Sequence, residues 1–575
     1  MACWVVNVCG VYLGLVAMGE VHAAAVTRVS TLDTGAQAAQ GGTDVSMSAD
    51  GRIVLFRSRA ALTPDSIDDL TVKTYLRAIE TGVVTYLKAL PTPETDPADS
   101  ANNDRVLLAG DGAHVAFESS VRLTADDTND VRDVFILDVA TSTISRANLP
   151  DGVAAPADAA RLAGVSHDAT FVAFESAGSY VAADTNNVMD VYVRHRTAGK
   201  TARASIPDGD TPASPKQTTL PIRQAVLSAN GYNVTFVSDE ALVSNDLNNT
   251  ADVYLRFLGD EVKDAGLSRI SVGADAKEAT VASLNPRISA DGNLVAFETA
   301  GAFSTQDPNG EVDVYARDTE SNQTVLISAD DNGVAAGPAS AAAVSADGRY
   351  VAFTSPAAFD PGDTDTVSDV YLVHAATRKR FRVSEVQSGA PGGAGVSNNV
   401  SIGANGQRVA FSTAGALVAD DTNGVSDVYL RSPTLSIVSP ADGSTVNDIV
   451  SVRVEVSGTV VGSFDARIRF LVDGVVNSAQ ATEAPATFIL GALCPGPHTL
   501  EVALIDGTGE ITPVSHRITV HAADSNQSLC TPASTGNSSG GGGGGAIIHF
   551  EIGVWSLMVL GIARRQRLKP RRFTR

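Results

Sequence analysis

The chain has little cysteine, histidine and tryptophan. Four cysteines in 575 residues exclude a disulfide-dense scaffold, and two of them, Cys3 and Cys9, lie in the apolar N-terminus. The nine histidines are scattered, without an H-E-x-x-H motif or another zinc-ligand spacing. A G-x-S-x-G match at 536–540 lies in a Ser/Gly-rich segment, where no nucleophile elbow is expected. The sequence therefore shows no catalytic constellation, although its 65 acidic residues could supply a glycosidase-type carboxylate pair anywhere.

Basic residues are also few. Lysine and arginine total 42 against 65 acidic residues, which gives a formal net charge of −23. Seven of these basic residues lie between Arg564 and Arg575, so the rest of the chain is more acidic still. Such a body repels nucleic acid and anionic lipid and attracts cations. We therefore expect no nucleic-acid partner.

Long apolar runs occur at the two ends of the chain. Residues 1–23 are apolar and end in small residues, with Val21 and Ala23 at −3 and −1 of a cleavage site. This pattern predicts a secretory signal, although no basic residue precedes the run; a buried N-terminal helix is the alternative. Near the other end, the apolar residues 546–563 precede the basic cluster 564–575. Their length approaches the roughly 20 residues that span a bilayer, and the basic cluster should stay cytoplasmic.

A nine-residue pattern, S-x-[DN]-G-x-x-V-x-F, recurs through the chain. Its phenylalanines stand 56 to 62 residues apart, at Phe56, Phe117, Phe174, Phe236, Phe297, Phe353 and Phe411. An Asp-Gly or Asn-Gly pair between alternating apolar residues predicts a hairpin of two strands, A and B. A third strand, C, follows in segments such as DVYVRH (190–195), and a fourth, D, completes each copy. Seven such copies predict an all-β fold, a seven-bladed β-propeller over residues 24–432.

The seventh copy lacks its outer strand, because the chain passes from DVYLRS (427–432) directly into Pro433. The segment AVTRVSTL (25–32) matches the missing strand and precedes the first copy. We therefore predict that residues 25–32 close the ring by pairing with 427–431, which also removes an exposed sheet edge. An open stack of sheets is the alternative.

The S-x-D-G…V-x-F half and the D-V-Y half of each copy resemble the TolB-type propeller repeats of exported bacterial proteins. The resemblance covers about residues 25–432 and implies the fold. It leaves function open, because propellers serve binding, scaffolding and catalysis alike.

Residues 433–522 have several short alternating segments separated by Asp-Gly pairs, which predict a small β-sandwich. The segments SPADGSTV, FLVDG and PHTLEVALIDGTG resemble bacterial Ig-like modules, which act as spacers or weak adhesion units. Cys494 and Cys530 could form a disulfide in an oxidising compartment; reduced thiols or a bond between chains are the alternatives.

The chain ends in a Gly/Ser-rich linker, 523–545, and the apolar and basic segment 546–575. The order of glycine run, apolar stretch and arginine cluster resembles the GlyGly-CTERM sorting signals of Gram-negative bacteria. The resemblance implies transient anchoring in the inner membrane, cleavage by a rhomboid-type sorting protease, and display at the cell surface. A permanent membrane anchor is the alternative.

The most repeated polar feature is a loop between strands B and C with the pattern D-x-[ND]-x-x-x-D, which the first copy lacks. Oxygen ligands at positions 1, 3 and 7 of a tight loop suit Ca²⁺. The alternative is structural, with Asx turns and with the last Asp binding loop amides. The candidate ligands are Asp127, Asn129, Asp133, Asp184, Asn186, Asp190, Asp246, Asn248, Asp252, Asp307, Asn309, Asp313, Asp363, Asp365, Asp369, Asp421, Asn423 and Asp427.

No copy carries a unique set of acids, bases or nucleophiles, and an enzyme needs such asymmetry. We therefore expect an exported cell-surface binding or scaffold protein whose propeller face recognises a protein or envelope-polymer ligand. A secreted hydrolase or lyase with its active site in the propeller funnel is the alternative.

Overall fold

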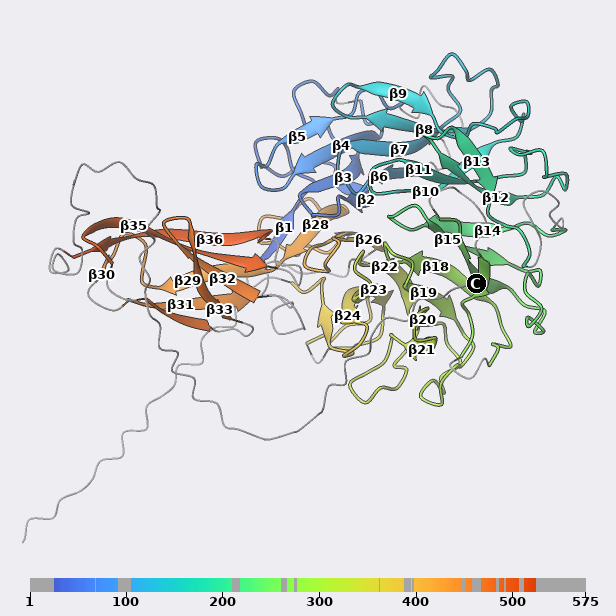
Figure 1. Ribbon diagram of the computed structural model, residues 1–575. Coiled ribbons are helices and arrows are strands. Elements are labelled where there is room, and N and C mark those ends of the chain that lie inside the picture. The colour runs from blue at the N-terminus through green and yellow to red at the C-terminus, as the bar shows by residue number, and fades with distance from the viewer. Residues whose placement is uncertain are drawn as a thin grey trace, which may run out of the picture.

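The computed structural model describes residues 25–523, except 68, 92–104, 209–217, 260–265, 274–276, 361, 387–394, 396–397, 447–449, 458–466, 482–485, 491–492 and 506–510. These residues form thirty-six strands and no helix, in seven four-stranded sheets, one of three strands and one of five. The predicted all-β fold, a seven-bladed propeller followed by a small sandwich, is confirmed (Figure 1). The predicted signal at 1–23 and the C-terminal segment 546–575 lie outside the described residues. Within the described ranges, no helix has the length and apolar character needed to cross a membrane.

Each blade is a meander of four antiparallel strands. Blade 1 consists of β2 (Gly42–Met47), β3 (Ile53–Ser58), β4 (Lys73–Ala78) and β5 (Val84–Tyr86). Blade 2 consists of β6 (Val106–Leu108), β7 (His114–Ser119), β8 (Asp133–Asp138) and β9 (Thr143–Arg146). Blade 3 consists of β10 (Ala160–Val165), β11 (Phe171–Ser176), β12 (Asp190–His195) and β13 (Lys200–Arg203). Blade 4 consists of β14 (Arg223–Leu227), β15 (Asn233–Ser238), β16 (Asp252–Phe257) and β17 (Gly266–Arg269).

The remaining blades repeat this order. Blade 5 consists of β18 (Ser283–Ile288), β19 (Leu294–Thr299), β20 (Asp313–Asp318) and β21 (Gln323–Leu326). Blade 6 consists of β22 (Ser340–Val344), β23 (Tyr350–Ser355), β24 (Asp369–His374) and β25 (Arg380–Arg382). Blade 7 consists of β26 (Asn398–Ile402), β27 (Val409–Thr413), β28 (Asp427–Ser432) and β1 (Ala25–Arg28). The first strand of each blade contacts the first strands of its two neighbours, so these strands form the inner wall of the ring.

Strand β1 closes the ring in the way that the sequence predicts. It pairs antiparallel with β28, in a register that places Val26 opposite Arg431 and Arg28 opposite Tyr429. The Val29 N–H also donates to the Val428 carbonyl at 2.7 Å. The outer edge of β28 is therefore paired, and blade 7 has four strands like the other blades.

The turns between strands A and B form a second closed circuit. Each turn bonds to the next blade's turn through a backbone N–H and a carbonyl 2.7 to 3.1 Å apart. The circuit returns to its start, because the Ala404 N–H of blade 7 donates to the Ala49 carbonyl of blade 1. The blades are thus joined by backbone hydrogen bonds as well as by side-chain packing.

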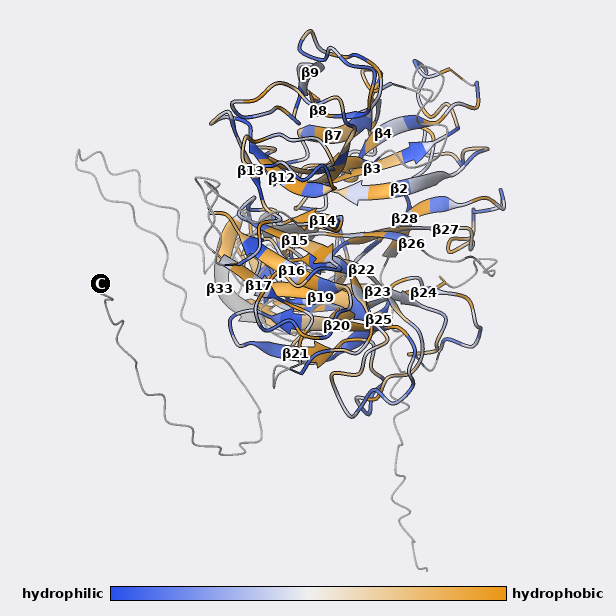
Figure 2. Cartoon of the chain, turned by 90° about the vertical axis from the view of Figure 1, so that its right-hand side faces the viewer, coloured by the Kyte–Doolittle hydropathy of each residue, from blue (hydrophilic) through white to orange (hydrophobic). Residues whose placement is uncertain are grey.

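Aromatic and aliphatic side chains fill the space between neighbouring blades. The repeated phenylalanine of strand B stacks on the aromatic residue opposite it in strand C, as with Phe56 and Tyr75, whose ring centroids are 5.9 Å apart. Both rings pack with Ala410, Val428 and Leu430 of blade 7 in one buried cluster. Figure 2 shows hydrophobic residues concentrated in strands such as β15, β16 and β19. These side chains are buried only when neighbouring blades pack together, so the stability of each blade depends on the blades beside it.

The second domain is a two-sheet sandwich that begins one residue after β28. Its smaller sheet contains β29 (Thr434–Ser439), β31 (Val450–Ser457) and β34 (Ala486–Leu490). Its larger sheet contains β30 (Thr445–Val446), β36 (Ile511–Ala522), β35 (Gly496–Ile505), β32 (Arg467–Val472) and β33 (Val475–Ala481). The two sheets enclose a core in which Phe470 stacks on Phe488 at 5.1 Å. Cys494 is disulfide-bonded, and Cys530 lies outside the described residues.

Candidate functional site

The six acidic loops all connect strand B to strand C of a blade. In a four-stranded meander these connections emerge at the end opposite to the A–B turns, so the loops share one face of the ring. The last aspartate of each loop is the first residue of strand C, for example Asp252 at the start of β16. The first and last aspartates are buried in every loop except for Asp369, which is partly exposed. Buried carboxylates require compensating partners.

The first aspartate of five loops accepts a hydrogen bond from a tyrosine of strand C. The donors are the hydroxyls of Tyr192, Tyr254, Tyr315, Tyr371 and Tyr429, each eight residues after its aspartate. In blade 5 the distance from Tyr315 Oη to Asp307 Oδ2 is 2.6 Å. Blade 2 has Phe135 in place of this tyrosine, so Asp127 lacks the equivalent bond.

The middle residue of five loops forms an Asx turn. Its side-chain oxygen accepts from the backbone N–H two residues later, at 2.8 to 3.1 Å, in Asn186, Asn248, Asn309, Asp365 and Asn423. In blade 2 the Asn129 amide, oriented with its nitrogen inward, donates to Asp133 at 3.2 Å and to Asp127 at 3.3 Å. These bonds hold the loop backbone without any ligand.

The last aspartate of each loop is bound by a side chain just beyond strand D. In blades 3 to 7 a serine hydroxyl donates to Oδ1 of this aspartate. The same hydroxyl accepts the backbone N–H of the residue that follows the aspartate. In blade 2 the Asn148 amide makes both bonds: it donates to Asp133 Oδ1 and accepts the Val134 N–H. Burial raises the pKa of Asp133, Asp190, Asp252, Asp369 and Asp427, and it raises the pKa of Asp313 to about 6.

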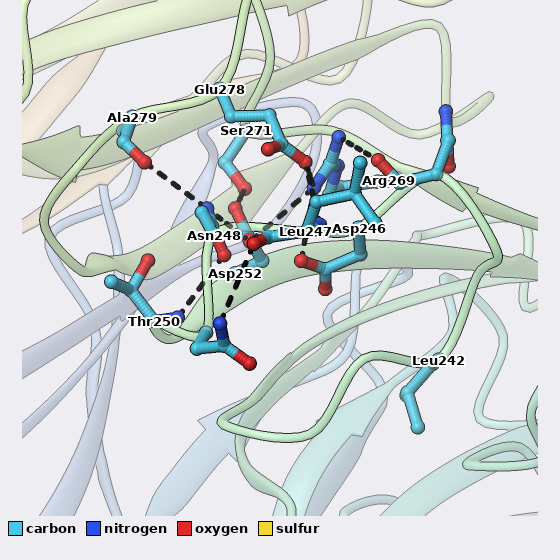
Figure 3. Close-up of polar contacts among 12 residues, drawn as sticks. Leu242, Asp246, Leu247, Asn248, Thr250, Asp252, Arg269, Ser271, Glu278 and Ala279 are labelled. Carbon is cyan, nitrogen blue, oxygen red and sulfur yellow. Dashed lines mark hydrogen bonds and ion pairs between the residues drawn. The ribbon is translucent and has the colours of Figure 1, made fainter.

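An arginine of strand D lies against the loop carboxylates in five blades, buried in four of them and partly buried in blade 6. In blade 4, Arg269 Nη1 is 3.1 Å from Asp246 Oδ1 and 3.7 Å from Asp252 Oδ2. Figure 3 shows Asp246, Asn248, Asp252, Ser271 and Glu278 gathered around this guanidinium. The equivalent arginines are Arg146, Arg203, Arg382 and Arg28. Each guanidinium partly neutralises the carboxylates that burial brings together.

The predicted ligands therefore do meet in each loop, but mostly around a guanidinium. Asp363, Asp365 and Asp369 of blade 6 have carboxylate oxygens within 4.8 Å of one another, which is a metal-like grouping. Arg382 Nη1 lies 3.7 Å from Asp363 Oδ1 and 3.5 Å from Asp369 Oδ2, within that grouping. The geometry favours the structural alternative in the blades that carry an arginine, and Ca²⁺ binding by the loops stays a prediction.

Blades 1 and 5 differ from the other five. In blade 1, Tyr86 stands where β17 has Arg269, and Lys73 replaces the last aspartate and pairs with Asp69. In blade 1 the cation is therefore Lys73, the first residue of strand C, in place of a strand D arginine. In blade 5, Leu326 occupies the arginine position opposite Tyr315. The arginines of the other blades are not among the site residues predicted from the sequence. They do recur in the sequence, two residues before the serine that follows strand D, as in TRVS (27–30) and LSRIS (267–271).

A pocket of about 390 Å³ lies where blade 7 meets blade 1. Its lining includes Val72 and Ser426, which precede strands C, so it opens on the face that carries the acidic loops. The two blades meet closely, since the Gly42 N–H donates to the Ser426 carbonyl at 2.7 Å. A Cβ on the neighbouring Gly41 would lie 1.8 Å from that carbonyl oxygen, so glycine is required there. Sequence reasoning missed this pocket because its two walls, residues 40–72 and 399–426, lie more than 320 residues apart in the chain.

The described lining of the pocket is polar and locally basic. Arg57 and Arg59 flank the end of β3, against one acid, Asp44. Arg57 Nη1 lies 4.0 Å from Asp44 Oδ2, and Arg59 is exposed and donates to the Leu70 carbonyl at 3.0 Å. Asp44 and Asn399 have φ of +53° and +49° at bulges of β2 and β26. Gln224 and Asn285 have φ of +55° and +51° at the equivalent bulges of β14 and β18, so these bulges belong to strand A of several blades.

Comparison with known proteins identifies the second domain. Residues 433–502 match the family described as Bacterial Ig domain. No curated protein matches the chain. Among solved structures, one assigned as TolB from Agrobacterium tumefaciens shares 14% identity, with a TM-score of 0.30, over 50% of this chain and 80% of that chain.

Two further solved structures are similarly distant. The extracellular domain of a protein assigned as a hybrid two-component system from B. thetaiotaomicron shares 10% identity, with a TM-score of 0.36, over 87% of this chain and 59% of that chain. The Niastella koreensis GH74 enzyme shares 9% identity, with a TM-score of 0.23, over 86% of each chain. The propeller assignment accordingly stands on its own sheet topology, and residues 433–502 match the family described as Bacterial Ig domain.

Proposed function

We propose that this chain is an exported cell-surface binding protein of a Gram-negative bacterium, and that its propeller captures a partner that presents carboxylates. The pocket between blades 7 and 1 supports this proposal, since it carries Arg57 and Arg59 against the single acid Asp44. On a chain of net charge −23, a locally basic pocket is selective for a local anionic group. Guanidinium groups bind carboxylates through paired, charge-assisted hydrogen bonds.

The exposed Arg59 is the residue best placed to bind such a partner. A guanidinium has five N–H donors, so its bond to the Leu70 carbonyl leaves donors for a ligand. Arg57 also lines the pocket, but it is buried beside Asp44 and so is less accessible to a ligand.

A hydrolase or lyase at this pocket is less well supported. Glycoside hydrolysis uses two carboxyl groups on either side of the scissile bond. The described residues that line the pocket contain one, Asp44. The residues that line the pocket therefore fit binding better than hydrolysis.

The other regions fit a role in display. The bacterial Ig domain at 433–502 extends the chain beyond the propeller, as a spacer would. The predicted signal at 1–23 directs export, and the predicted sorting segment 546–575 places the protein in the inner membrane until a rhomboid-type protease releases it to the surface. The partner is then a protein or an envelope polymer outside the cell.

Binding of two carboxylate polymers to the purified protein tests the proposal. Polygalacturonate presents carboxylates on a polysaccharide and poly-L-glutamate presents them on a polypeptide, so the pair distinguishes the two kinds of partner. Dextran is the neutral control. We expect Arg59→Ala to weaken binding about 10-fold or more, the value of a charged hydrogen bond. Arg52→Ala is the matched control, because Arg52 is exposed at the opposite end of β3. Equal binding by the two variants, or equal binding of dextran, would contradict the proposal.

A further inference from the structure

Blade 5 departs from the charge pattern that the other blades share. Blades 2, 3, 4, 6 and 7 place a strand D guanidinium against the loop carboxylates, and blade 1 supplies Lys73 instead. In blade 5 the same position in the register belongs to Leu326, which is buried and apolar. The described part of the chain places no basic side chain in ion-pair contact with Asp307 or Asp313.

The two blade 5 carboxylates are nevertheless as buried as their counterparts. Asp307 is 6% exposed and Asp313 is 0% exposed. Asp313 Oδ1 accepts from the Ser328 hydroxyl at 2.6 Å, as Asp252 Oδ1 accepts from Ser271 in blade 4. Its other oxygen, Oδ2, therefore faces the loop, as Asp252 Oδ2 does toward Arg269.

The oxygen Asp313 Oδ2 differs most from its counterparts in the other blades. It is buried and has no hydrogen-bond partner, whereas the corresponding Oδ2 atoms of blades 3, 4 and 7 accept from the loop asparagine at 2.9 to 3.0 Å. An unpaired buried carboxylate oxygen facing a second carboxylate is costly unless a cation compensates it.

We propose that a divalent metal cation, with Ca²⁺ as the fitting chemistry, binds between Asp307, Asn309 and Asp313 and takes the part that a guanidinium plays in the other blades. Calcium accepts six to eight oxygen ligands from carboxylates, amide and backbone carbonyls and water, in flexible geometry. The two aspartates offer carboxylate oxygens, and the Asn309 oxygen has a second lone pair besides the one used in its turn. Asn309 is exposed, so water completes the coordination from that side.

Calorimetric titration and thermal melting of the full chain test this site. We expect one Ca²⁺ per chain with a Kd of about 10⁻⁴–10⁻³ M, as in extracellular modules. At about ten times Kd, the melting temperature should rise by about 1–3 °C over a sodium control of equal ionic strength. Leu326→Arg supplies the guanidinium of the other blades, so this variant should neither bind Ca²⁺ nor respond to it.

Two further variants keep the test decisive. Asp313→Asn removes one ligand charge without adding bulk, and it should lose the calcium response even if Leu326→Arg does not fold. Asp369→Asn makes the same change in blade 6, where Arg382 is present, and it should respond as the unmodified chain does. The proposal is overturned if the unmodified chain does not bind Ca²⁺ at about ten millimolar. It is equally overturned if the response survives Asp313→Asn, or if about six ions bind per chain.

Discussion

At the scale of single residues, the propeller buries many ionisable groups and compensates most of them within the same or the next blade. Glu118 of β7 shows how far such compensation goes. Its Oε1 accepts the Leu162 N–H of blade 3 at 2.6 Å, and its Oε2 lies 3.7 Å from Arg132 Nη1 without a hydrogen bond. Burial raises the pKa of Glu118 to about 7, and the hydrogen bond and nearby arginines only partly oppose this.

This raised pKa makes stability depend on pH. Between about 4.5 and 7 the folded chain keeps a proton on Glu118 that the unfolded chain loses, so the free energy of unfolding falls as the pH rises through this range. Glu118→Gln keeps the acceptor for the Leu162 N–H and removes the titration. At pH 8 we expect the variant to be more stable, by up to about 3 kcal/mol, and at pH 4 to match the parent.

Urea denaturation at several pH values measures this difference. Glu311→Gln, at an exposed position, is the control for loss of a carboxylate as such. A Glu118→Gln chain that is less stable than the parent at pH 8 would show that the charged form is well compensated, and that our view of this residue is wrong.

At the scale of strands and turns, the elements with local signals are those that the sequence predicts well. The S-x-[DN]-G pattern gives each A–B hairpin, and alternation around DVY gives strand C, because both depend on neighbours in the chain. The acidic loops were correctly placed between strands B and C. The sequence does not reveal their arginines as partners, because each contact depends on the sheet register and not on the local pattern; the separation from the aspartate ranges from 13 residues for Arg146 to 393 for Arg28.

The A–B turns also carry a steric requirement for glycine. Gly231 has a φ of +80°, and a Cβ added there would lie 2.3 Å from the Phe171 ring of blade 3. Gly35 has a similar φ of +83° with nothing within 4 Å. Gly35→Ala should therefore cost about 1–2 kcal/mol from backbone strain alone, and Gly231→Ala about 1–3 kcal/mol more from overpacking.

Chemical denaturation of the two variants measures both costs. Equal losses of stability for Gly35→Ala and Gly231→Ala would mean that the blade 3–blade 4 contact is looser than the structure has it.

At the scale of the whole molecule, ring closure determines more than the number of blades. Strand β1 brings Arg28 to the blade 7 carboxylates and Ser30 to Asp427. The following segment places Gly41 and Gly42 against Ser426, which forms one wall of the proposed binding pocket. The sequence predicts the closure from a missing strand, but the pocket follows only once blades 7 and 1 meet in space.

The ends of the chain lead to a prediction about the mature protein. The short apolar stretch 546–563 and the basic cluster 564–575 favour a segment that is cleaved after the chain reaches the inner membrane. We expect the intact mass of the surface form to correspond to a chain that ends near the glycine run. Peptides from beyond Arg564 in the surface fraction would identify a permanent anchor instead.

The closure itself can be measured directly by hydrogen exchange of the native protein, read by mass spectrometry. Residues 26–29 should exchange much more slowly than an exposed turn, because β1 is paired with β28 along one edge and Val26, Arg28 and Val29 are buried. The surface turn at 33–36 provides an internal reference for rapid exchange. If residues 26–29 exchange much more slowly than that turn, the ring is closed by its N-terminal strand. Exchange of these residues at the rate of the surface turn would contradict the closed ring, and with it the pocket that closure builds.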